Sequence, residues 1–82
     1  MGKSVKEVIE FVGIIEKDEN MQLLVKAAKS PAEIIRIAES VGIKMSMNQL
    51  RYWSREMTAQ YFPWAERGNQ WRREYFEEER LD

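Results

Sequence analysis

Few side chains in this sequence could carry out chemistry. The chain has no histidine and no cysteine, so it lacks the commonest general base and metal ligand as well as any thiolate. The remaining candidates are carboxylates, namely Glu66, Glu74 and the glutamate run 77–79. Nothing in the sequence holds two of them at a fixed separation, and consecutive helical residues do not converge on one point. We therefore expect no catalytic residues, no metal, no cofactor and no enzymatic activity.

The residue types best suited to binding are concentrated in the second half of the chain. Eight of the nine aromatic residues lie between Tyr52 and Phe76, and six of the seven arginines follow residue 50. Tryptophan, tyrosine and arginine are enriched at protein–protein hot spots. The residues that we expect to contact a partner protein are Tyr61, Phe62, Trp64, Arg67, Trp71, Arg72, Arg73, Tyr75 and Phe76.

A second interpretation is that these rings fold back and complete the core of the chain itself. It is favoured for Leu50, Trp53 and Met57, which share one stripe with the core helices. From Trp64 onward the two interpretations remain open, because a chain of 82 residues has little interior in which to bury every ring.

Helix start and stop signals organise the rest of the chain. The clearest set lies at 30–42, where Ser30 and Glu33 form a capping box, Pro31 occupies the first helical position and Gly42 ends the helix. Further capping boxes predict a helix over 4–17, from Ser4 and Glu7, and another over about 47–61, from Ser46 and Gln49. Between them, Asp18 caps a helix that ends near residue 29.

The C-terminal part reads as a separate helical arm. Pro63 ends the fourth helix, and Asn69 caps a last amphipathic segment. The sequence therefore predicts an all-α protein, with a compact four-helix domain over residues 3–60 and an aromatic, arginine-rich arm over residues 62–82. Gly13, inside the first helix, implies either close packing or a tolerated weakness.

Charge composition limits the partners. Thirteen basic and fourteen acidic residues leave a net charge of −1, which gives no general attraction to nucleic acid or to an anionic membrane. The sequence contains no signal peptide and no apolar run long enough to span a bilayer. We expect a cytoplasmic protein that binds another protein, with pairing of two copies through the arm as an alternative.

Between residues 4 and 50, several features follow one another in a fixed order. They are Val8, Phe11 and Ile15, the run 17–21 (Lys-Asp-Glu-Asn-Met), the run 30–35 (Ser-Pro-Ala-Glu-Ile-Ile), Gly42-Ile43, and Ser46 before Leu50. In order and spacing they resemble the small helical domain of the nitrogen-fixation-associated Nif-eleven family. The resemblance covers a little over half of the chain.

The resemblance implies one of two roles. Some family members are leaders of modified peptides, which end in a Gly-Gly or Gly-Ala cleavage site and continue into a core peptide rich in Cys, Ser or Thr. This chain has no such site and only Ser54 and Thr58 beyond residue 50, which disfavours a precursor. The resemblance then implies a non-catalytic accessory factor of nitrogen fixation that docks, through the aromatic arm, on a nitrogenase component or its assembly machinery.

An alternative function is DNA binding by a small helix-turn-helix regulator. The string Leu50-Arg51-Tyr52-Trp53 resembles the end of the recognition helix in mercury-resistance-type regulators, and Arg51 and Arg55 share a helical face. However, the segment between Gly42 and Leu50 is about two residues longer than that motif allows. The chain also lacks a basic excess, so this alternative is the weaker one.

Overall fold

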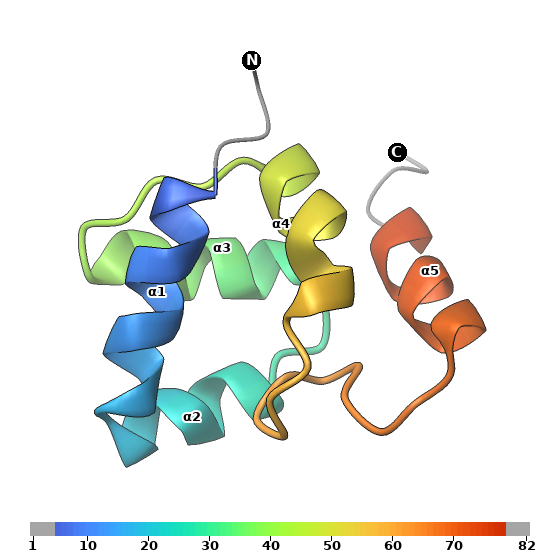
Figure 1. Ribbon diagram of the computed structural model, residues 1–82, viewed down its shortest axis with the longest axis horizontal. Helices are drawn as coiled ribbons and strands as arrows, with labels where there is room; N and C mark the ends of the chain where they lie inside the picture. The colour runs from blue at the N-terminus through green and yellow to red at the C-terminus, as the bar shows by residue number, and fades with distance from the viewer. Residues whose placement is uncertain (1–4, 79–82) are drawn as a thin grey trace.

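A computed structural model describes residues 5–78, and these residues fold as helices joined by short connections, except for a longer irregular segment over 57–68 (Figure 1). The α-helices are α1 (Lys6–Glu16), α2 (Glu19–Lys26), α3 (Pro31–Ser40), α4 (Met47–Trp53) and α5 (Asn69–Glu78), and a 3-10 turn, η1 (Ser54–Glu56), follows α4. The all-α prediction is confirmed, as is a helical C-terminal segment. None of the helices in this described part has the length and apolar character needed to cross a bilayer.

Two of the predicted helix starts are confirmed by their hydrogen bonds. The Asp18 carboxylate accepts the backbone N–H groups of Asn20 at 3.0 Å and Met21 at 3.3 Å. The Ser46 hydroxyl accepts the Gln49 N–H, and the Gln49 side chain accepts the Ser46 N–H, both at 3.0 Å. These bonds satisfy donors that a helix leaves unpaired at its start. The Ser4–Glu7 box involves Ser4, which lies outside the described residues.

The predicted capping box at Ser30 is wrong. The Ser30 side chain makes no capping bond, because the Ser30 backbone carbonyl already accepts the Glu33 N–H at 3.1 Å. The Glu33 carboxylate instead accepts the backbone N–H of Lys29 at 2.9 Å. The helix still starts at Pro31. The Glu33 carboxylate accepts the backbone N–H of Lys29, one residue before the Ser30 N–H that was predicted.

The fourth helix is shorter than predicted. It was expected to reach residue 61, but α4 ends at Trp53 and η1 ends at Glu56. The buried Ser54 hydroxyl donates to the Arg51 carbonyl at 2.7 Å. Met57 then leaves the helical conformation, with φ −97° and ψ 82°, and its carbonyl accepts the indole N–H of Trp64 at 2.8 Å. The helical conformation therefore ends before Pro63 is reached, at Met57, whose carbonyl accepts from a residue seven positions later.

One hydrophobic core runs through both halves of the chain. Phe11, Ile15, Val25, Ile34 and Leu50 are fully buried in it. The C-terminal segment adds four rings to the same cluster, those of Phe62, Trp64, Tyr75 and Phe76. Leu50 and Met57 are buried as predicted, and Trp53 packs partly buried against them. In the view of Figure 1, α4 lies between α1 and α5.

Truncating a ring of α5 tests whether this helix is part of the folded unit. Phe76 is 1 % exposed, and Phe76→Ala is expected to lower the free energy of unfolding by about 3–5 kcal/mol, because a buried ring is replaced by a cavity. Trp71→Ala, at a half-buried ring, is the control and should cost less. Urea denaturation followed by circular dichroism measures both. Equal, small losses would mean that α5 does not pack on the core.

Substitutions of Gly13 and Gly42 are expected to change stability in opposite directions. A Cβ at Gly13 would meet nothing within 4 Å, so close packing is not the reason for this glycine. Gly13→Ala should stabilise the protein by about 1 kcal/mol through helix propensity. Gly42 has a φ of +85°, so Gly42→Ala should destabilise it by about 1 kcal/mol or more. Thermal unfolding of both variants gives the signs, and a destabilised Gly13→Ala would contradict the open environment.

Candidate protein-binding surface

Four of the nine residues predicted to bind a partner are buried in the chain's own core. The exposed fractions are 1 % for Phe62, 4 % for Trp64, 8 % for Tyr75 and 1 % for Phe76. Their rings pack on one another, and Phe62 stacks on Trp64 with ring centres 5.1 Å apart and planes 9° apart. For these four, the prediction that they contact a partner does not hold in this conformation. The reason is that they complete the core, which was the second interpretation of the sequence.

The other five residues are spread over several hollows, and Arg67 and Arg72 line one of them together. Arg67 places its guanidinium 4.8 Å from the ring centre of Trp71, beside a hollow of about 560 Å³ next to the end of α2. Arg72 and Arg73 line a different hollow, together with residues of α4 and η1. Tyr61 faces α1 and α2. Trp71, Arg67, Arg72 and Arg73 therefore lie along adjoining hollows, Tyr61 lies apart from them, and binding by these five residues remains a prediction.

An apolar groove that the sequence did not predict runs along α1. It has a volume of about 600 Å³ and lies between α1 and the segment 53–62. Ile9 is 62 % exposed and Val5 is 36 % exposed. The residues that line it, called the α1 groove below, are Val5, Val8, Ile9, Val12, Glu16, Trp53, Glu56, Met57, Thr58, Ala59, Tyr61 and Phe62.

The sequence contains a signal that could have indicated this groove. Helix α1 carries apolar residues on more of its surface than one core-facing stripe requires, because Val8, Phe11 and Ile15 already form its buried face. Val12 and Ile14 are partly buried against the core, while Ile9 is exposed. When the apolar face of a helix is wider than the area that neighbouring elements cover, part of it remains exposed and can make another contact.

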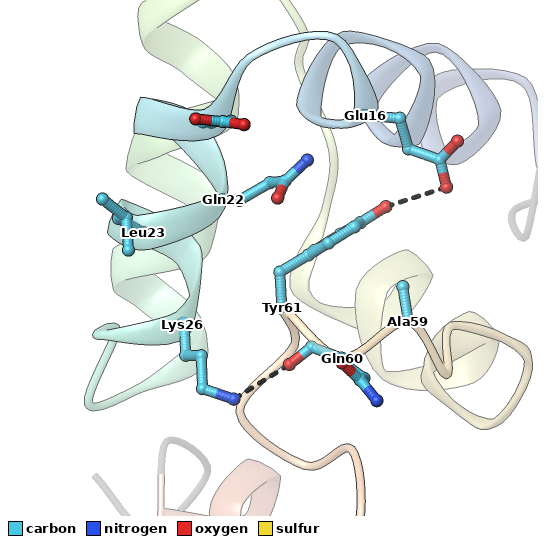
Figure 2. A pocket seen from close by; sticks show the side chains of 8 residues that line it. Glu16, Gln22, Leu23, Lys26, Ala59, Gln60 and Tyr61 are labelled. Carbon is cyan, nitrogen blue, oxygen red and sulfur yellow. Dashed lines mark hydrogen bonds between the residues drawn. The ribbon is translucent and has the colours of Figure 1, made fainter.

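A second hollow, of about 640 Å³, continues the groove towards α2. Figure 2 shows Tyr61 between α1 and α2, with its hydroxyl donating to the Glu16 carboxylate at 3.3 Å. On the opposite side, the Lys26 ammonium donates to the Gln60 carbonyl at 3.1 Å. Glu16, Ala59 and Tyr61 line both hollows. These contacts hold the segment 59–61 in place as the shared wall.

The charges around the α1 groove are of one sign. Its charged lining residues are Glu16 and Glu56. Apolar side chains with carboxylates at the margin favour an apolar ligand that carries basic groups. Within residues 5–78, no three residues of the types His, Cys, Asp or Glu are grouped so that they could hold a metal ion. The arrangement is suited to binding a chain segment.

The phenol of Tyr61 provides a probe of this wall. Burial, then the charge of Glu16 and the hydrogen bond to it, raise the pKa of Tyr61 to about 12. The folded state therefore favours the protonated phenol over the phenolate. The stability that the protonated Tyr61 adds to the fold is complete below about pH 10 and is lost as the pH rises towards 12. Glu16→Gln should lower the pKa of Tyr61 towards its ordinary value. Ring-carbon NMR signals, assigned with Tyr61→Phe, follow the ionisation. An unchanged pKa in Glu16→Gln would contradict the contact.

No family model, no curated protein and no solved structure matches this chain. What the chain does is therefore inferred from the residues of the α1 groove and from the resemblance of residues 4–50 described above.

Proposed function

We propose that this chain is a cytoplasmic, non-catalytic module that binds a partner protein in the α1 groove. The observation that supports the proposal is the exposure of large apolar side chains over a hollow, with Ile9 at 62 % and Val5 at 36 %. Contiguous apolar surface of this kind marks interaction sites more often than isolated exposed residues do. Trp53, partly buried at the groove, adds the ring type that most often anchors an interface.

The occupant that fits best is an amphipathic helix with basic residues beside its apolar face. The lining residues on this side run from Val5, the N-cap residue of α1, to Glu16, a length of roughly 16 Å at 1.5 Å per residue, or about three helical turns. A helix of similar length can place apolar anchors at i, i+4 and i+7 in such a groove. Lys or Arg side chains next to those anchors would meet Glu16 and Glu56.

The identity of the partner is proposed from the resemblance alone. Because residues 4–50 resemble the Nif-eleven family, a nitrogenase component or an assembly factor is the partner to test first. In this proposal the C-terminal segment acts differently from the sequence-based expectation. Met57, Tyr61 and Phe62 form one wall of the groove, and the buried rings behind them hold that wall against the core.

DNA binding through a helix-turn-helix is the second candidate, and the helix lengths do not favour it. Helix α4 spans seven residues, and Arg55 lies beyond it in η1. Arg51 and Arg55 are therefore not on one continuous recognition helix. They do line a common hollow with two arginines of α5.

A charge placed in the groove tests the proposal. Ile9→Lys should weaken partner binding at least about tenfold, which corresponds to about 1.4 kcal/mol, because an ammonium replaces the most exposed apolar side chain of the groove. The matched control is Leu24→Lys, at a residue 55 % exposed that lines none of the hollows described here. Proteins captured from nitrogen-fixing cells by the wild-type chain are identified by mass spectrometry, and their affinities for both variants are measured by calorimetry.

The control should bind within about twofold of the wild-type chain. Because both substitutions are at exposed positions, circular dichroism should show unchanged helix content in each. Equal affinity of the two variants for the same captured protein would exclude the groove as the binding site. If Trp71→Ala weakened binding while Ile9→Lys did not, the exposed part of the C-terminal segment would be the contact surface.

A further inference from the structure

Four arginines converge on a small hollow away from the α1 groove. The hollow has a volume of about 310 Å³ and is lined by Arg51 and Tyr52 of α4, Arg55 of η1, and Arg72 and Arg73 of α5. No carboxylate is among the described residues that line it. The two pairs come from segments far apart in the sequence, which meet where Arg72 bonds Ser54 across 18 positions. This hollow is called the arginine pocket below.

Arg72 is held in place by neutral acceptors. Its Nη1 donates to the Ser54 hydroxyl at 2.7 Å, while its Nη2 and Nε donate to the Asn69 side-chain oxygen at 2.8 and 3.3 Å. Ser54 is fully buried and donates onward to the Arg51 carbonyl. A guanidinium has five N–H donors, so three are used here and two remain. The side chain is fixed in orientation, yet no carboxylate in these bonds neutralises its charge.

The neighbouring charges add to this positive potential. Partial burial lowers the pKa of Arg72, and the positive charges of Arg55 and Arg73 lower it further. Like charges brought together on a partly buried side chain reduce stability in the absence of an anion. A bound anion would reverse the sign of that contribution, because each guanidinium would gain a partner of opposite charge.

We infer that the arginine pocket binds the phosphate or diphosphate group of a small ligand. Guanidinium groups match the oxygen geometry of phosphates, and several can share one group that has three or more oxygens and a charge near −2. A single carboxylate, with two oxygens and one charge, would leave most of the four arginines unpaired. A long nucleic acid is disfavoured because the chain as a whole carries a net charge of −1. The volume of about 310 Å³ suits a small ligand.

Titration with inorganic pyrophosphate tests this inference. The arginine side-chain N–H signals are followed by ¹⁵N NMR at a fixed ionic strength, and the signals of Arg51, Arg55, Arg72 and Arg73 should shift and saturate together. Arg55→Gln and Arg73→Gln should each weaken binding on the order of tenfold, because each removes a charge-assisted contact. Arg36→Gln is the matched control: it removes the same charge from an exposed side chain of α3 and should change the affinity less than about twofold. Arg72 is left intact because it also bonds Ser54 and Asn69.

Further ligands identify the source of the phosphate. Inorganic phosphate and adenosine diphosphate are titrated in parallel; tighter binding of the nucleotide would show that the group is carried by a nucleotide, with Tyr52 beside it. Citrate binding as tightly as pyrophosphate, or equal losses in Arg36→Gln and Arg55→Gln, would overturn the inference. Saturable binding of duplex DNA without any saturable pyrophosphate shift would also overturn it, in favour of a nucleic-acid surface. Ile9→Lys should leave pyrophosphate binding unchanged, so this test is independent of the α1 groove.

Discussion

The hydrogen bond from the Trp64 indole to the Met57 carbonyl is the contact on which the rest of the structure depends. Trp64 is 4 % exposed, so its N–H requires an acceptor inside the protein. It finds one at 2.8 Å in the Met57 carbonyl. In a continuous helix that carbonyl would instead accept the N–H of Tyr61, four residues later. In the structure Met57 has left the helical conformation, with ψ 82°, and its carbonyl accepts the indole N–H in place of the helical bond.

Both candidate binding surfaces depend on the end of the helical conformation at Met57. Because the chain leaves the helix at Met57, the segment 57–62 can run beside α1 and form the second wall of the α1 groove. The same change of direction brings α5 against η1, where Arg72 bonds the Ser54 hydroxyl and the arginine pocket forms. Stacking of Phe62 on Trp64 and the contact of Trp64 with Phe76, at 5.1 and 5.3 Å, keep the segment in place.

Most local signals in the sequence were reliable, although the equally local capping box at Ser30 did not form. Asp18, Ser46 and Gly42 end or begin helices as predicted, because each acts within a few residues of its own position. The end of α4 could not be predicted in this way, since it depends on Trp64, which lies well beyond it. The role of the rings was ambiguous for a different reason. Aromatic residues are enriched both in cores and at interfaces, so composition alone did not place Phe62 or Phe76 inside. The arginine pocket combines two distant pairs of residues, and no short motif contains both.

The two walls of the α1 groove differ in how they are held. The α1 wall is a helix, and its repeated backbone hydrogen bonds fix the positions from which successive side chains project. The opposite wall is irregular chain, anchored at its ends by the buried Met57 and Phe62, while Thr58 and Gln60 between them are exposed. Substitutions at Thr58, which is exposed and lines the groove, would therefore reshape the groove at little expense to the core. A scaffold with one constant wall and one variable wall can acquire new binding preferences without having to fold in a new way.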